Sequence, residues 1–351
     1  MRSFDYSTLK EKTWDHEIIS LIAQIHEYKG RQEVYLKQKP EELNKLVEIA
    51  KRRSTEASNA IEGIRTTNAR LKELCEEKTT PKNRDEEEIL GYRDVLNTIH
   101  ENYEYIPIRT NYILQLHRDL YKYTEKSIGG HFKISQNVIA AIDRNGKEYI
   151  LFTPLAPYET APAMDAICES YNKMIENDEL DAILLIPIFI HDFLCIHPFS
   201  DGNGRMSRLL TALLLYRSGY VVGKYISIES KIANNKDLYY KALEDCQSGW
   251  YENDEDVTPF VKYMLRIILA AYRDFEERVE LVSEKLPAKE MVRRAIYSKM
   301  GKLSKSDISE LCPSIGVKSV ELALKQLVDE GVLEKKGLGR ATFYIRKDIN
   351  L

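Results

Sequence analysis

The sequence predicts a mainly helical protein with one β-hairpin near its middle and a small helix-and-strand module at its end. Three observations lead to this fold class. Apolar residues recur at helical spacing over most of the chain, as far as Leu281. Near the middle, Asn145-Gly146 separates two short runs of β-forming residues, which is typical of a hairpin. Beyond residue 287, three helical patterns accompany two strand patterns, as in a winged helix-turn-helix domain.

The bulk composition is that of a soluble globular protein with two or three domains. The chain has 351 residues, of which 43% are hydrophobic and 30% charged. The net charge of -4 excludes a protein that is basic overall, but the charge is uneven. Residues 287–351 hold 13 Lys and Arg against 8 Asp and Glu, whereas the remainder holds 38 against 47. We therefore expect a separate basic module at the C-terminal end.

The cysteines and the hydropathy pattern indicate the cellular compartment in which the protein is expected. The five cysteines form no CxxC pair and no cluster with histidine, so we expect free thiols in a reducing compartment. No stretch approaches 18 apolar residues, and Met1–Asp5 does not resemble the start of a secretory signal. We expect a cytoplasmic protein without a membrane segment.

Apolar residues at helical spacing predict the helices of the first two domains. Residues 1–100 are predicted as an N-terminal helical region, with helices at 17–27, 41–60 and 86–103. Residues 101–282 form the next predicted domain, with helices at 109–125, 161–176, 179–195, 204–215, 236–243 and 257–281, and with the hairpin at 132–153. The helix at 180–195 is apolar on all sides, so it is expected at the centre of this domain.

Residues 287–351 are predicted as the winged helix domain, with helices at 290–300, 304–311 and 317–330. Strand patterns at 332–334 and 342–345 flank a basic glycine turn. The domain has basic residues that could contact DNA phosphates, namely Lys318, Lys325, Lys335, Lys336 and Arg340. However, the acidic residues Glu321, Asp329 and Glu330 interrupt the expected recognition helix. A role in binding DNA, in binding a protein, or in forming a dimer therefore stays open.

The densest chemistry lies between two apolar helices, at residues 197–208. Gly202-Asn203-Gly204 opens a helix, and the backbone N–H groups of a helix N-terminus attract anions. Arg205 and Arg208 are three residues apart in the first turn, so both can face the same anion. Arginine is suited to bidentate binding of phosphate. The pattern indicates a site for nucleotide phosphates.

Two further residues of this loop indicate a reaction. Asp201 lies beside the predicted phosphate site, an arrangement that Mg²⁺ bridging a carboxylate and phosphates explains. His197 is four residues earlier and can accept a proton from a hydroxyl. Together they indicate attack by an activated hydroxyl on phosphorus. A zinc site of His191, His197 and Asp201 is the rival interpretation, but the spacing of the histidines does not suit it and two arginines would repel the metal.

A second segment, Ser58-Asn59-Ala60-Ile61-Glu62-Gly63, ends the helix predicted at 41–60. Ser58 and Glu62 are four residues apart and share a helix face, and Gly63 is a helix-ending signal. From spacing alone the segment is a capped helix end with a solvated glutamate.

The residues from Ile196 to Arg208 are similar to the full motif of the Fic (filamentation induced by cAMP) family. The resemblance extends over residues 40–280. It implies a helical Fic fold whose 132–153 hairpin is a flap. It also implies a protein adenylyltransferase, an enzyme that moves AMP from ATP to a Ser, Thr or Tyr hydroxyl of a protein and releases pyrophosphate.

The resemblance assigns roles to individual residues. His197 resembles the catalytic base and Asp201 the Mg²⁺ ligand. The remaining matching residues are implied to bind the nucleotide: Gly202, Asn203 and Gly204 as the anion cradle, Arg205 and Arg208 on the outer phosphates, and Tyr239 and Tyr240, with Asn235, near the adenine. Ordinary packing of the two tyrosines stays open. The flap is implied to hold the protein substrate by strand addition.

Ser58, Glu62 and Gly63 resemble the inhibitory motif of the family, here on a helix at about 50–64. Our hypothesis is that Glu62 pairs with Arg208 and occupies the space of the γ-phosphate. Removal of AMP, with Glu62 orienting a water, is an alternative. Phosphotransfer as in the Doc-type branch is not favoured, because that branch has Lys where Gly204 stands. A DNA-binding regulator is the alternative from another class. Self-modification and a homodimer also stay open.

Overall fold

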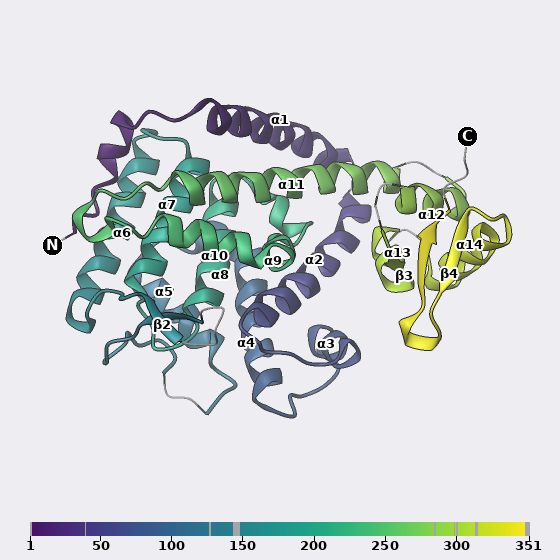
Figure 1. The fold of residues 1–351 in the computed structure, drawn as a ribbon, viewed down its shortest axis with the longest axis horizontal. Coiled ribbons are helices and arrows are strands. Elements are labelled where there is room, and N and C mark those ends of the chain that lie inside the picture. The colour runs from purple at the N-terminus through teal and green to yellow at the C-terminus, as the bar shows by residue number, and fades with distance from the viewer. Residues whose placement is uncertain are drawn as a thin grey trace. The chain divides into compact units, whose positions relative to one another are not determined.

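A computed structural model describes residues 2–38, 40–125, 128–142, 148–283, 286–297, 299, 301–312 and 315–347. It confirms the mainly helical fold (Figure 1). The chain divides into two compact units. The first consists of Met1–Glu27 and Ala50–Ala271, and the second of Tyr28–Ile49 and Tyr272–Leu351. Among the described residues, no helix is both long enough and apolar enough to cross a membrane.

The first unit contains most of the elements. In chain order they are η1 (Tyr6–Glu11), the start of α1 (His16–Gln38), the end of α2 (Pro40–Ile61), α3 (Asn68–Cys75), α4 (Arg84–Asn102), η2 (Tyr103–Tyr105), α5 (Thr110–Leu120), β1 (Ile139–Ile142), β2 (Glu148–Phe152), α6 (Pro157–Glu176), α7 (Ala182–Ile196), α8 (Asn203–Arg217), η3 (Val221–Lys224), α9 (Ile228–Asn234), α10 (Lys236–Asp245), η4 (Trp250–Glu252) and most of α11 (Thr258–Ser283). Sequence reasoning missed α3, a short helix between two loops.

Helix α7 is the centre of this unit, as predicted. Its apolar side chains are buried on every face, including Ile183, Leu185 and Phe189. It packs against α6 and α8, and α8 in turn packs against α4. The loop between α7 and α8 is therefore held by two helices that cannot move without opening the core.

The domain boundary predicted near residue 100 is not a boundary between compact units. Helix α4 packs against α5 and α8, and it buries Ile89, Val95 and Ile99. Residues 84–102 therefore belong to the same unit as the predicted catalytic loop. The division instead falls within α1, α2 and α11, near Glu27, Ala50 and Ala271. A helix that runs through a boundary has no linker composition, so the sequence offers no signal for it.

The hairpin is shorter than predicted. Strand β1 pairs antiparallel with β2, with Ala141 opposite Tyr149 and a register irregularity between Ile139 and Ala140. The predicted turn at 143–146 lies outside the described residues. Residues 132–138, expected to lead into the first strand, have no regular structure. They bond to the loop after α7 instead of to a partner strand, as described below.

The second unit contains the basic C-terminal module. After α12 (Ala288–Tyr297) come β3 (Leu303–Ser304), α13 (Lys305–Leu311), α14 (Val317–Asp329), β4 (Leu333–Lys336), η5 (Gly339–Ala341) and β5 (Phe343–Arg346). The strands form an antiparallel sheet in the order β3-β5-β4. The Ser304 hydroxyl accepts from the Asp307 N–H, and the Asp307 carboxylate accepts from the Ser304 N–H. This reciprocal capping explains why α13 starts there.

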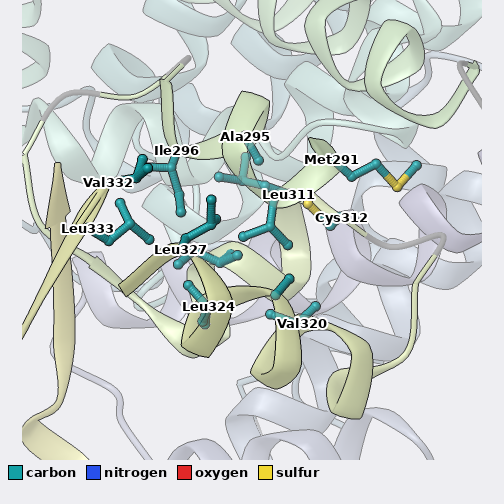
Figure 2. Packing of buried hydrophobic residues seen from close by; sticks show 13 residues of the cluster. Met291, Ala295, Ile296, Leu311, Cys312, Val320, Leu324, Leu327, Val332 and Leu333 are labelled. Atoms are coloured by element: carbon teal, nitrogen blue, oxygen red, sulfur yellow. The ribbon is translucent and has the colours of Figure 1, made fainter. Parts of the chain in front are cut away.

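The core of this module is apolar and continuous. Figure 2 shows buried side chains from α12, α13 and α14 meeting those at the start of β4. Val292, Ile308 and Leu327 are fully buried within it. The three helices and two strands that the sequence predicted are present, with β3 added. The assignment as a winged helix domain and the DNA contacts of Lys318, Lys325, Lys335 and Lys336 stay predictions, and the side chain of Arg340 lies outside the described part.

Candidate nucleotide site at the start of helix α8

A cavity of about 440 Å³ lies at the N-terminus of α8, within the first unit. This volume is in the range of small-molecule sites. The predicted residues that line it are Glu62, His197, Asp201, Gly202, Asn203, Gly204, Arg205, Arg208, Tyr239 and Tyr240. Lining residues that sequence reasoning did not select include Arg84 and Glu88 from α4, Ile139 and Leu151 from the hairpin, and Leu243, Glu244 and Gln247 from and just after α10.

His197 follows the last residue of α7 and enters the cavity wall. Its backbone is left-handed, with φ of 50°. The ring Nδ1 lies 3.2 Å from the carbonyl oxygen of Leu194, to which a protonated Nδ1 donates. Burial lowers the pKa of His197 to about 4, against a smaller opposing effect of the Leu194 carbonyl. The imidazole is therefore neutral at pH 7, and this tautomer leaves the Nε2 lone pair available to a substrate proton.

The loop that follows is closed by its own polar side chains. The Asn203 side chain accepts from the Phe199 N–H at 2.9 Å and donates to the Phe199 carbonyl at 2.7 Å. Gly202 has a φ of 83° and precedes the first residue of α8. Asn203 stays a predicted member of the anion cradle, although its side-chain amide closes the loop. What it offers an anion is its backbone N–H at the helix start.

Arg208 joins the end of α2, where inhibition is predicted, to the predicted phosphate site at the start of α8. Its Nη2 lies 2.6 Å from Glu62 Oε1, and its Nε donates to Ser58 Oγ at 2.8 Å. The same Nη2 donates to the Ser58 carbonyl at 3.0 Å. Although burial alone would lower the pKa of Arg208, the charge of Glu62 raises it above its usual value. The predicted pairing of Glu62 with Arg208 is present in the structure.

Gly204 lets Glu62 approach the start of α8. A Cβ atom at this position would lie 2.3 Å from Glu62 Oε1, closer than any real contact. Glu62 thus lies directly over the second residue of the helix, where an anion would bind. A lysine at position 204, as in the Doc-type branch, would not fit beneath Glu62.

Arg205 has different partners from Arg208. Its Nη2 lies 2.8 Å from Glu88 Oε2 and donates to the Tyr121 hydroxyl at 2.7 Å. The expectation that both arginines face one anion is therefore only partly met, since one guanidinium edge of Arg205 is held by α4 and α5. Its Nε and Nη1 have no hydrogen-bond partner among the described residues, although the side chain is 1% exposed. Arg205 nevertheless lines the cavity, so these unpaired N–H groups are candidates to bind a ligand there.

Asp201 is fixed by the loop. One carboxylate oxygen accepts from the Gly202 N–H at 2.7 Å, and the carbonyl oxygen of Asp201 lies 3.0 Å from His117 Nε2. The other ring nitrogen of His117 accepts from the Gly130 N–H at 3.1 Å. His117 also stacks on Phe199, with 3.7 Å between the ring centroids. Sequence reasoning passed over His117, although its place on the buried face of a helix, beside Leu116 and Leu120, was a usable signal.

The zinc interpretation is not supported. His191 is fully buried, and its Nε2 lies 3.6 Å from Cys195 Sγ, its neighbour one turn along α7. Among the described residues, no three His, Cys, Asp or Glu side chains gather where a metal could bind them. His191 is a core histidine, and burial lowers its pKa to about 4.

The two tyrosines of α10 lie on one wall of the cavity but differ in exposure. Tyr239 is 3% exposed and its hydroxyl interacts with Ser207 and Arg208, whereas Tyr240 is 43% exposed. The rings meet edge to face at 5.4 Å. Tyr239 therefore supports the wall, and Tyr240 is the one with a surface free for a base. Asn235, which directly follows the last residue of α9, is not among the lining residues.

The end of α2 is held by several contacts besides that of Arg208. Ser54 donates to Glu229 of α9 at 2.6 Å, and Tyr92 of α4 donates to the same carboxylate at 3.2 Å. Lys236, at the start of α10, donates to the carbonyl oxygen of Ile61 at 2.7 Å. The element that carries Tyr239 and Tyr240 is thus bonded to the helix end that carries Glu62.

Comparisons with known proteins find similarity to one family. A family model described as the Fic/DOC family matches residues 107–215. A protein of Drosophila yakuba named Protein adenylyltransferase Fic is 29% identical over 211 residues, which are 59% of this chain and 38% of that protein. A Fido domain-containing protein of Dictyostelium discoideum is 27% identical over 148 residues, 42% of this chain and 96% of the other. The chain spans 28% to 39% of the length of the relatives named protein adenylyltransferase.

Solved structures show the same fold. A Fic family protein from Desulfovibrio desulfuricans G20 superposes with a TM-score of 0.62 at 21% identity, covering 97% of this chain and 98% of that one. A Fic domain containing signaling protein from Bacteroides thetaiotaomicron gives a TM-score of 0.60 at 25% identity, covering 75% and 97%. With the family motif at the mouth of its cavity, this chain contains a Fic/DOC domain at residues 107–215.

Proposed function

We propose that the protein is a protein adenylyltransferase that Glu62 holds in an inhibited state. The observation that carries the proposal is the contact of Glu62 with Arg208 over the start of α8, beside a neutral His197. A base, an anion site and a carboxylate on that anion site line one cavity. Relatives named protein adenylyltransferase support the same chemistry.

The reaction assigns a task to each part of the cavity. His197 Nε2 accepts the proton of the target hydroxyl while the hydroxyl oxygen attacks the α-phosphorus of ATP. A P–O bond to the target forms, the bond to the bridging oxygen breaks, and pyrophosphate leaves. The N–H groups at the start of α8 and the unpaired N–H groups of Arg205 hold phosphate oxygens. His197 is suited to the base role because burial keeps it neutral.

Asp201 is the residue that would hold Mg²⁺. It lines the cavity, and the Gly202 N–H fixes the direction of its carboxylate. One carboxylate with phosphate oxygens and waters is an ordinary Mg²⁺ environment, so the residues present fit this ion. When bound, the ion would neutralise phosphate charge.

Glu62 opposes the reaction by charge and by volume. Its carboxylate occupies the N-terminal end of α8 and pairs with Arg208, which an outer phosphate would otherwise use. A nucleotide that binds beside it cannot place its phosphates against α8, so its α-phosphorus is not aligned with His197. Near-attack geometry is a large part of rate acceleration, so misalignment suffices to inhibit.

The test uses labelled ATP and the full chain. Glu62→Gly should raise transfer of AMP to protein, whether to itself or to a lysate target, at least about tenfold, because Arg208 becomes free for phosphate. His197→Ala in the same background should abolish transfer while leaving ATP binding within a few-fold. Unchanged transfer by Glu62→Gly would contradict inhibition, and transfer that survives in His197→Ala would contradict the base.

Removal of AMP is the second candidate. It is favoured by the position of the Glu62 carboxylate, which is 33% exposed and acts electrostatically on His197. Such a group could orient a water. A target pre-modified by Glu62→Gly should then lose AMP faster with the wild type than with Glu62→Gln. Equal rates would leave transfer as the sole proposed activity.

The hairpin is proposed to hold the target. Val138, Tyr149 and Ile150 of this region are exposed, with Ile150 at 61%, while Ile139 and Leu151 line the cavity. A peptide that adds to the edge of β1 or β2 would therefore lie beside His197, reading backbone more than sequence. Ile150→Lys should raise the KM for a protein target without changing ATP binding.

A further inference from the structure

The segment before β1, residues 132–138, holds the backbone of the loop that carries His197. The Lys133 N–H donates to the Pro198 carbonyl at 2.9 Å, and Lys133 Nζ donates to the Ile196 carbonyl at 3.0 Å. Asn137 Nδ2 donates to the His197 carbonyl at 3.2 Å and to the Phe199 carbonyl at 3.1 Å. Four consecutive carbonyl groups, 196 to 199, therefore accept hydrogen bonds from two residues.

These contacts fall where the chain needs support. His197 has a φ of 50°, a conformation that a residue with a side chain rarely adopts without help from its surroundings. Ile196 is fully buried and ends α7, where carbonyl groups lack a partner within the helix. The Lys133 ammonium supplies that partner and a positive charge at the negative end of the helix.

Lys133 also sets the direction of the Asn137 amide. Its Nζ lies 2.9 Å from Asn137 Oδ1, so the amide oxygen faces the ammonium and Nδ2 faces the loop. The reversed amide would point its oxygen at two carbonyl oxygens and its NH₂ at a cation. Lys133 is 3% exposed, which removes competing water. The pair therefore has one favourable arrangement.

We propose that Asn137, oriented by Lys133, is a positioning residue that holds His197 at the angle its role as base requires. The proposal rests on the proposed function of His197. Because β1 begins at Ile139, two residues after Asn137, the same segment joins the target-binding hairpin to the base. A target that moves β1 thus acts on His197 through Asn137.

The kinetic test is made in the full chain with Glu62→Gly. Asn137→Asp keeps the size of the side chain but turns an oxygen toward two carbonyl groups, so kcat should fall about 10- to 100-fold with the KM for ATP within about twofold. Lys133→Met should act in the same direction, and Lys133→Arg should restore kcat to within about threefold. Ser135→Ala is the matched control, since Ser135 is exposed in the same segment and should leave both constants unchanged.

A second measurement does not depend on transfer. Histidine ring NMR on the full chain, with His197→Gln to assign the signal, reports tautomer and titration of His197. The parent should show one neutral Nδ1–H tautomer down to about pH 5, and Asn137→Asp should show exchange between tautomers and titration nearer pH 6.5. If Glu62→Gly transfers no AMP, the proposed function fails and the NMR result alone decides the positioning role. An unchanged ring signal, or unchanged kcat in an active parent, would overturn it.

Discussion

Two arginine–glutamate pairs lie three residues apart in the first turn of α8, and they differ in what surrounds them. Arg205 and Glu88 approach within 2.8 Å, with side chains 1% and 3% exposed. Arg208 and Glu62 approach within 2.6 Å, with side chains 3% and 33% exposed. The distances are alike, so the difference lies in solvent and in the elements that carry the two glutamates.

Glu88 lies inside α4, on the face that packs toward α8, and a second arginine, Arg84, lies 2.8 Å from it. Glu62 follows the last residue of α2 and precedes Gly63, which has a φ of 83°. To remove Glu88 from its partner, α4 would have to leave the core. To remove Glu62, a helix end would have to fray. The Arg205–Glu88 pair therefore stabilises the fold, whereas the Arg208–Glu62 pair can separate without unfolding the core.

The largest effect should come from Glu88→Gln. It leaves the buried charge of Arg205 without its carboxylate, so we expect a loss of about 3–5 kcal/mol in the free energy of unfolding. Glu62→Gln is the matched substitution at the other pair and should cost less than about 1 kcal/mol, because water screens a partly exposed pair. Urea unfolding of both variants measures the difference. Equal losses in the free energy of unfolding would show that the two arginine–glutamate pairs do not differ in their contribution to stability.

A smaller effect is expected from Ser58→Ala. It removes the hydroxyl that accepts from Arg208 Nε and thereby loosens the arginine that Glu62 uses. A buried hydrogen bond of this kind contributes about 1 kcal/mol, so AMP transfer should rise about fivefold, less than with Glu62→Gly. Glu56→Gln, on the same helix and without a contact to Arg208, is the control. Lower transfer in Ser58→Ala would show that Arg208 needs Ser58 to bind phosphate.

The smallest effect is expected in the pH dependence of activity. It tests whether His197 keeps its lowered pKa without the charge of Glu62. With its pKa lowered to about 4 by burial, His197 stays in the base form down to about pH 5. In the Glu62→Gly background, kcat/KM should therefore not fall between pH 8 and pH 5.5. A loss of activity centred near pH 6.5 would show that the imidazole is more exposed to solvent than the structure indicates.

The lowered histidine pKa values also determine how the free energy of unfolding changes with pH. Between about pH 6.5 and 4 the unfolded chain binds protons on His197, His117 and His100 that the folded protein does not, since burial lowers all three pKa values. The free energy of unfolding should therefore fall as the pH falls through this window. Glu86 adds a loss at lower pH, because hydrogen bonding to Arg70 lowers its pKa to about 2. Urea unfolding at stepped pH measures both.

Sequence reasoning recovered most helices and predicted an anion site in the loop, because both patterns are local. The period of apolar residues predicts α4, α7 and α8, and a glycine-rich helix start followed by arginines predicts an anion site wherever it folds. Short elements such as α3 and β3 were missed because they have too few residues to show a periodic pattern of apolar side chains. The compact units do not divide at residue 100, because α4 packs against α5 and α8.

By itself, the sequence determined that a base, a carboxylate, a helix N-terminus and two arginines fall within twelve positions. The tertiary structure alone decided which partner each arginine has, and that His117, Lys133 and Asn137 hold the loop. Those partners lie 60 to 150 positions away along the chain. Hydrogen bonds and burial at such separations depend on how helices pack, and no local pattern encodes that packing.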